Sequence, residues 1–132
     1  MMKKNPRTAE VKKAIDELIQ TATTYDIETL DRIYHDDMTV VMVDTDDNVN
    51  TADKAAFKDI FKSKKEAGDP PMDTWAKYHR IDVNGDKARV LLSRKNNLSG
   101  TNMILFLSID LMFEDNRWQV LREVIFLRPE TT

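Results

Sequence analysis

The spacing of apolar residues changes once along this chain, from the period of a helix to the period of a strand. In the first half, Val11, Ile15 and Leu18 recur at steps of three and four residues, which places them on one helical face. From Asp73 onward, apolar and polar residues alternate, as in a strand with one buried face. The sequence therefore predicts helices followed by a sheet, the α+β class.

Three helices are expected before residue 70. The first begins at Pro6, a residue suited to the first helical position, and its apolar face reaches Tyr25. Asp26 caps a second, shorter helix. After a strand at Met38–Val43, the third helix covers Thr51–Gly68.

Two hairpin turns organise the second half. Asn84-Gly85 is the strongest short hairpin signal in the chain, and Asp115-Asn116 is a second candidate turn. A loop at Asn96–Gly100 joins the hairpins into a four-stranded antiparallel meander. Its strands are expected at residues 73–83, 86–95, 103–114 and 117–127.

Strict alternation assigns the hairpin side chains to two faces, because residues paired across a hairpin point the same way. We expect the more apolar set of the first hairpin, and the row containing Arg122 in the second, to turn toward the helices. These inward residues are Trp75, Lys77, His79, Ile81, Val83, Ala88, Val90, Leu92, Arg94, Met103, Leu105, Leu107, Ile109, Leu111, Phe113, Trp118, Val120, Arg122, Val124 and Phe126.

Both faces of the second hairpin are largely apolar, so something must cover the outer one. A second copy of the chain is the simplest cover, which predicts a homodimer; a loop or the C-terminal tail is the alternative. The residues expected at the dimer interface are Ile104, Phe106, Met112, Leu121 and Ile125.

Composition and charge argue against several kinds of binding partner. The 20 Lys and Arg residues are interleaved with 23 Asp and Glu residues, for a net charge of −3, which argues against a nucleic-acid partner. The chain has no Cys, no metal-ligand spacing and no glycine-rich phosphate loop, so we expect neither a metal nor a cofactor.

The chain is expected to form one domain over residues 1–132, with flexible ends at 1–6 and 128–132. No apolar run reaches membrane-spanning length and no secretory signal begins the chain. We therefore expect no membrane partner and a cytoplasmic location, unless a leader was removed.

Several inward polar residues are candidates for a site, each with a structural alternative. His79 is either a general base or acid, or a partly buried His held by one hydrogen bond. Arg122 needs a partner, which is either an anionic or carbonyl-bearing ligand or a carboxylate such as Asp44. Trp75 and Trp118 either stack on a planar ligand or fill the core.

Two further residues stand at the edge of the expected pocket. The hydroxyl of Tyr34 either reaches the pocket or lies at the rim of its helix. Arg94 lies near a strand end, where its long side chain can extend to solvent.

Four segments carry a resemblance to a known superfamily. They are Tyr25-Asp26-Ile27-Glu28-Thr29-Leu30, Tyr34-His35-Asp36-Asp37, Val83-Asn84-Gly85-Asp86-Lys87-Ala88 and Asn116-Arg117-Trp118-Gln119-Val120. In their order and spacing, the chain resembles the nuclear transport factor 2-like superfamily, a cystatin-like cone. Within that superfamily, the segment Thr51–Phe57 and the turn Gly68-Asp69-Pro70-Pro71 look most similar to those of the bacterial lumazine-binding and polyketide-cyclase-like group. The resemblance implies a pocket between three helices and a strongly curved antiparallel sheet, and homodimers through the convex side of that sheet.

Ketosteroid-isomerase-like members place a carboxylate base near the end of the first strand and an oxyanion-binding Tyr on the first helix. The matching positions here are Met42 and Leu18, which can supply neither group. Asp44 could substitute for the base only if the strand register shifts. This departure from the pattern argues against ketosteroid-isomerase chemistry.

The sequence thus predicts a protein that binds a small, apolar or planar molecule inside the cone. One alternative is an isomerase, dehydratase or cyclase that uses His79 as base and Arg122 to stabilise negative charge; another is a protein-interaction module that binds through the convex sheet. The residues expected to contact the ligand are Trp75, His79, Arg94, Trp118, Arg122, Tyr34 and Met42.

Overall fold

The computed structural model describes residues 6–96 and 101–130, and these ranges contain three helices and six strands. In chain order they are α1 (Pro6–Thr23), α2 (Ile27–Ile33), β1 (Tyr34–Val43), β2 (Val49–Asp53), α3 (Lys54–Glu66), β3 (Ala76–Asn84), β4 (Lys87–Asn96), β5 (Met103–Glu114) and β6 (Arg117–Pro129). The predicted α+β class is confirmed. Most of the predicted flexible ends and of the loop at 96–100 lies outside the described residues.

Asp side chains begin the two shorter helices. Asp26 accepts a hydrogen bond from the backbone N–H of Thr29 (3.2 Å) and caps α2, as predicted. Asp53 caps α3 by accepting from the N–H of Ala56 (2.8 Å), so α3 begins three residues later than predicted. The difference arises because Thr51 belongs to β2, a short and mostly exposed edge strand whose polar sequence gave no strand signal.

One six-stranded sheet joins all the strands, in the order β2-β1-β6-β5-β4-β3. The predicted meander from β3 to β6 is present, and both residues of its Asp115-Asn116 turn have the positive φ that a tight hairpin turn requires. β1 pairs with β6 in parallel, so the sheet is mixed rather than antiparallel throughout.

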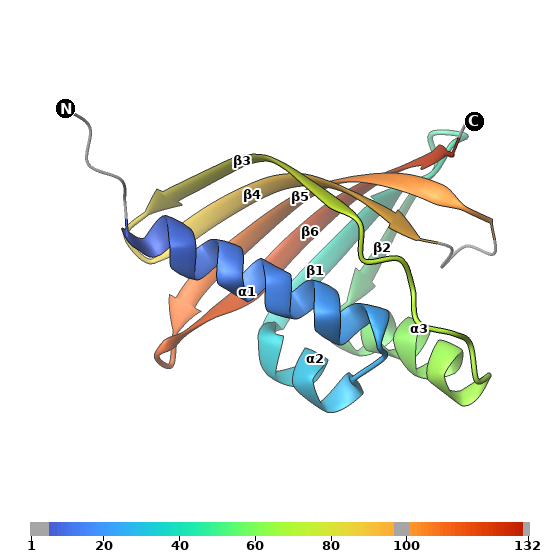
Figure 1. The fold of residues 1–132 in the computed structure, drawn as a ribbon, viewed down its shortest axis with the longest axis horizontal. Helices are drawn as coiled ribbons and strands as arrows, with labels where there is room; N and C mark the ends of the chain where they lie inside the picture. Colours follow the sequence, from blue (N-terminus) through green and yellow to red (C-terminus); the bar gives the residue numbers. More distant parts are fainter. Residues whose placement is uncertain (1–5, 97–100, 131–132) are drawn as a thin grey trace.

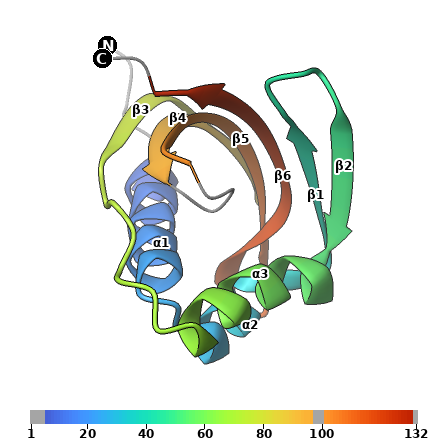
Figure 2. The same cartoon turned by 90° about the vertical axis from the view of Figure 1, so that its right-hand side faces the viewer.

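The sheet curves around α1, and α2 and α3 lie at one end of the concave side (Figures 1 and 2). The core fills this concave side: α1 contributes Val11 and Ile15, α3 contributes Phe57 and Phe61, and Val90 of β4 faces them. The predicted arrangement, three helices on a strongly curved sheet, is thereby confirmed.

A β-bulge in β6 reverses the facing of its second half. Asp110 pairs with Arg122 but Leu111 pairs with Val120, which leaves Leu121 as an extra residue. Arg122 and Phe126 are consequently exposed on the convex face, where Val124 is partly buried, and Glu123 turns toward the helices. The prediction that Arg122 points inward was therefore wrong.

A second bulge, in β3, also changes which side chains face the helices. Tyr78 pairs with Leu92 and Arg80 with Leu91, so His79 is the extra residue. Before the bulge, Ala76 and Tyr78 face the helices, in place of the predicted Trp75, Lys77 and His79. After the bulge, and throughout β4, the predicted facing is correct.

The bulge in β6 also changes the set of residues expected at a dimer interface. Ile125 is buried against the helices, and Phe126 takes its place on the convex face. Phe126 pairs directly with Phe106 of β5, and both rings are exposed.

Candidate functional site

A small cavity lies between α1, α3 and the concave face of the sheet. Its volume is about 60 Å³, and most of its lining consists of apolar side chains from α1, α3, β4, β5 and β6. Three polar side chains that can carry or share a proton also line it: Tyr34 at the start of β1, Arg94 in β4 and Glu123 in β6. We call this space the cone cavity.

Glu123 is the most unusual group in the cone cavity. The residue is 4% exposed, and its Oε2 atom is buried without a hydrogen-bond partner among residues 6–96 and 101–130. Burial raises the pKa of this carboxyl to about 7, against the opposing effect of the positive charge of Arg94. Glu123 can therefore both accept and donate a hydrogen bond near neutral pH.

Arg94 is held in place by backbone groups of the segment before β3. Its Nε donates to the carbonyl oxygen of Trp75 (3.0 Å) and its Nη2 to that of Asp73 (2.9 Å). Burial lowers the pKa of the guanidinium, and the charge of Glu123 acts in the opposite direction. These bonds fix a positive charge beside the cone cavity.

Tyr34 supplies a third polar group. Its ring is fully buried and packs against Phe57, with 5.8 Å between ring centroids. Burial, reinforced by the nearby charge of Glu123, raises the pKa of its hydroxyl well above the usual value. The hydroxyl therefore stays protonated and is available as a hydrogen-bond donor.

The three groups together can orient one polar end of a molecule whose remainder is apolar. Glu123 offers a carboxyl that changes protonation state near pH 7, Arg94 a fixed cation, and Tyr34 a neutral donor. Such a combination binds a carbonyl, hydroxyl or amide group, and a carboxyl with this pKa can also exchange protons with a ligand.

The cone cavity brings together only part of the predicted site. Tyr34 and Arg94 line it, as does Leu18, the residue that the sequence resemblance matches to the Tyr of ketosteroid-isomerase-like proteins. Met42 shares the inward face of β1 with Val40 but does not contribute to the lining.

The other four predicted residues lie elsewhere. Trp118 is buried beside a different groove, between α1 and the β5–β6 hairpin. Trp75 and Arg122 are exposed, and His79 is exposed on the convex face. The His79 ring stacks on Phe106 at 5.2 Å, and its Nε2 lies 2.7 Å from the hydroxyl of Ser93.

Asp44, considered as a partner for Arg122, instead closes its own turn. Its Oδ1 accepts hydrogen bonds from the backbone N–H groups of Asp46 and Asn48, both at 2.9 Å. These bonds lower the pKa of its carboxyl.

Sequence reasoning missed Glu123. Strict alternation placed it on the outer face, between the interface residues Leu121 and Ile125. The available signal was that the residues two positions away on either side, Leu121 and Ile125, are apolar, in a strand whose two faces are both largely apolar.

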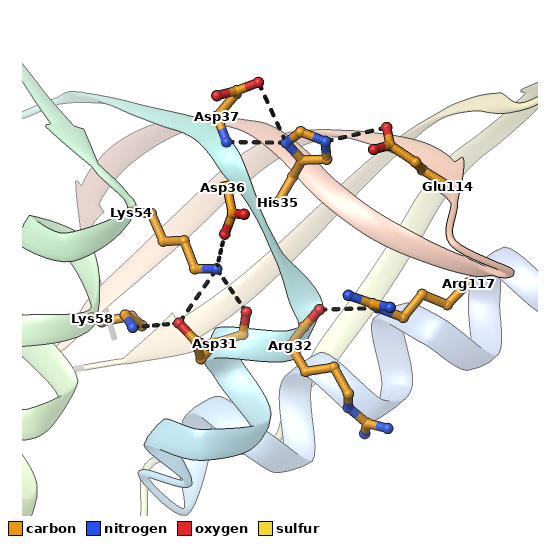
Figure 3. Close-up of polar contacts among 9 residues, drawn as sticks. All are labelled: Asp31, Arg32, His35, Asp36, Asp37, Lys54, Lys58, Glu114 and Arg117. Atoms are coloured by element: carbon orange, nitrogen blue, oxygen red, sulfur yellow. Dashed lines mark hydrogen bonds and ion pairs between the residues drawn. The ribbon is translucent and has the colours of Figure 1, made fainter.

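A separate polar network holds the start of β1, outside the cone cavity (Figure 3). Lys54 Nζ donates to the carbonyl oxygen of Asp31 (2.8 Å) and to Asp36 Oδ1 (2.9 Å), which ties α3 to α2 and β1. His35 Nδ1 accepts from the N–H of Asp37 (3.0 Å), and its Nε2 lies 3.3 Å from Glu114 Oε2. The network positions the segment from which Tyr34 enters the cavity.

The described part of the chain holds neither a cluster of metal-ligating side chains nor a membrane-spanning helix. Within residues 6–96 and 101–130, no three His, Asp or Glu side chains gather as a metal site would require. None of the helices in these ranges is long and apolar enough to span a membrane.

Solved structures share this fold at low sequence identity. A nuclear transport factor 2-like protein of unknown function from Shewanella baltica is 13% identical, with a TM-score of 0.77 over 98% of this chain and 100% of that one. A similar protein of unknown function from Silicibacter pomeroyi is 16% identical, with a TM-score of 0.76 over 96% and 100%. A ketosteroid isomerase-like protein from Erwinia carotovora atroseptica is 17% identical, with a TM-score of 0.67 over 96% and 100%.

These likenesses extend over whole chains, and at such identities they establish the fold alone. No curated protein matches the sequence. One family model does match it, that of the SnoaL-like domain, over residues 11–125. That span contains every strand and helix except the ends of α1 and β6, and the chain therefore belongs to the SnoaL-like domain family.

Proposed function

We propose that this protein binds a small, mostly apolar molecule in the cone cavity, with Glu123, Arg94 and Tyr34 contacting its polar end. The observation that carries the proposal is the buried Oε2 of Glu123, which has no hydrogen-bond partner within the described part of the chain. Leaving a carboxylate oxygen in this state destabilises the folded protein, and a ligand hydrogen-bond donor would remove that cost.

The size of the cone cavity limits the ligand. Its volume of about 60 Å³ holds only a few non-hydrogen atoms. A larger ligand requires side chains of the lining to move, and Met72 is suited to this because an unbranched thioether adopts many shapes at low cost. We therefore expect binding to be accompanied by displacement of Met72.

The test compares substitutions on the two faces of the sheet. Small amphiphilic molecules that raise the melting temperature of the wild type are carried forward to calorimetric titration. Glu123→Gln and Tyr34→Phe should weaken the binding of such a molecule at least about fivefold, since each loses a hydrogen bond to the ligand. Arg122→Gln, on the convex face, is the matched control and should bind as the wild type does. Equal binding by all four proteins would refute the proposal.

An enzyme is the second candidate, and the pKa of Glu123 favours it. A carboxyl with a pKa of about 7 is suited to general acid–base catalysis at neutral pH. In this reading Glu123 and Arg94 replace His79 and Arg122, which face away from the cavity. A panel of small ketones in D2O tests it: Glu123-dependent exchange of the proton beside the carbonyl supports catalysis, and exchange that persists in Glu123→Gln contradicts it.

We further propose that the chain forms a homodimer through the convex face of the sheet, where Phe106 and Phe126 are 37% and 43% exposed. Adjacent exposed aromatic rings on a sheet face are typical of an interface between subunits. A cytoplasmic location also stays a proposal.

A further inference from the structure

A second hollow, distinct from the cone cavity, lies between the first half of α1 and the β5–β6 hairpin. It has a volume of about 500 Å³, within the range of sites that hold small organic molecules, roughly 300–1,000 Å³. Its walls are α1 from Arg7 to Glu17, the end of α2, and residues 111–120 of the hairpin, which passes beneath the start of α1 in Figure 1. We call it the α1 groove.

The floor of the α1 groove is apolar. Trp118 and Val120 form part of it, and both are buried. The indole N–H of Trp118 donates to Glu10 Oε2 (3.2 Å), and the Phe113 ring packs edge-on against the indole at 5.3 Å between centroids. The Arg7 guanidinium lies 4.3 Å above the Phe113 ring. It also lies 5.1 Å from the centroid of the Trp118 ring, so a flat apolar molecule reaches these rings by moving the Arg7 side chain aside.

The rim of the α1 groove carries excess positive charge. Arg7, Lys13, Arg32 and Arg117 line it with only two carboxylates, Glu10 and Glu17, although the whole chain has a net charge of −3. Both carboxylates are engaged already. Glu17 binds Arg32 at 3.0 Å, and Glu10 accepts from Trp118 and lies 3.7 Å from Arg7.

Two of the rim cations have no carboxylate to balance them. Arg7 is paired with Asp86 at 2.9 Å, whereas Lys13 and Arg117 form no ion pair within the part of the chain that the structure describes. The Nε of Arg117 donates to the backbone carbonyl oxygen of Arg32 (3.4 Å), which directs the guanidinium across the groove toward the end of α2 (Figure 3). Its remaining N–H groups can bind a further acceptor.

We propose that the α1 groove binds a small organic anion, with the flat apolar part of the ligand on the Trp118–Phe113 floor and its anionic group between Lys13 and Arg117. Charge complementarity selects the anion, because the engaged carboxylates leave these two cations as the unbalanced charges of the groove. The site is separate from the cone cavity and does not depend on the function proposed for it.

The experiment uses 2-naphthoate as the probe and 2-naphthamide as its uncharged analogue. Binding is followed by titration calorimetry and by the indole N–H signal of Trp118 in ¹H–¹⁵N spectra. We expect naphthoate to shift this signal and to bind at least about fivefold more tightly than naphthamide, with an affinity that falls as sodium chloride is added. Lys13→Gln and Arg117→Gln should each weaken the binding of naphthoate about two- to fivefold, the usual effect of losing one exposed ion pair.

Lys62→Gln is the matched control, since Lys62 is an exposed cation of α3 far from the groove in sequence and outside its lining. It should bind naphthoate as the wild type does. Equal affinity for naphthoate and naphthamide would overturn the proposal. Shifts confined to the methyl signals of Leu92 and Leu105, which line the cone cavity, would also overturn it. So would a result in which only a peptide rich in Asp and Glu binds.

Discussion

At the scale of single residues, Glu123 is the least expected feature of this protein. A carboxylate in an apolar cavity loses its hydration, and one nearby Arg does not fully compensate. Natural proteins seldom bury an ionisable group with an unpartnered oxygen unless the group serves a function. The same group should also make the stability of the protein depend on pH.

We expect the free energy of unfolding to fall as pH rises from about 4.5 to about 7. In the folded protein Glu123 keeps its proton until the pH approaches its raised pKa of about 7, whereas in the unfolded chain it loses the proton near the ordinary value of 4.5. Unfolding therefore releases a proton in this window, at a total cost of roughly 3 kcal/mol in stability by pH 8. Urea denaturation at a series of pH values measures this change.

Glu123→Gln should remove most of this decline and exceed the wild type in stability above pH 7, because the amide carries no charge to desolvate. Glu66→Gln, at the exposed end of α3, is the control and should retain the wild-type slope. If the two variants show the same dependence on pH, the carboxyl of Glu123 is not protonated in the folded protein at pH 6.

At the scale of elements, the two β-bulges separate what could be predicted from what could not. The helices, the hairpin turns and the meander follow from apolar spacing and turn residues, which act locally. A bulge inserts one residue into the alternation, and neither His79 nor Leu121 has a side chain that marks it. Each one-residue error then reversed the facing of half a strand, and with it the predicted site around His79 and Arg122.

The bulge in β3 brings Tyr78 to the helices, where its hydroxyl donates to Asp16 Oδ1 of α1 at 2.6 Å. Tyr78→Phe should lower the free energy of unfolding by about 0.5–1.5 kcal/mol, the usual loss for one hydrogen bond. A double-mutant cycle with Asp16→Asn, followed by urea denaturation, isolates the pair from the separate contact between Asp16 and Lys12. Strictly additive effects would show that the two side chains are not coupled and would contradict the hydrogen bond.

At the scale of the whole molecule, the two faces of the sheet differ in what covers them. The concave face is covered by α1, α2 and α3 (Figure 2), whereas no helix lies over the convex face within the described residues. That convex face carries the paired rings of Phe106 and Phe126, with His79 stacked on the first. A monomer would expose these rings to water, whereas a symmetric dimer would bury the rings of both subunits.

Sedimentation velocity should therefore show a dimer at micromolar concentration, and Phe126→Lys should convert it to a monomer, because a dimer would bury two unpaired ammonium groups close together. Val49→Lys is the matched control: Val49 is 62% exposed but lies on the edge strand β2, so the substitution should leave the dimer intact. A monomeric wild type would remove the dimer proposal while leaving the cone cavity untouched, since none of the three polar groups of the cavity lies on the convex face. A wild-type dimer that survives Phe126→Lys would instead move the interface to another surface and leave the exposed aromatic pair for a different partner.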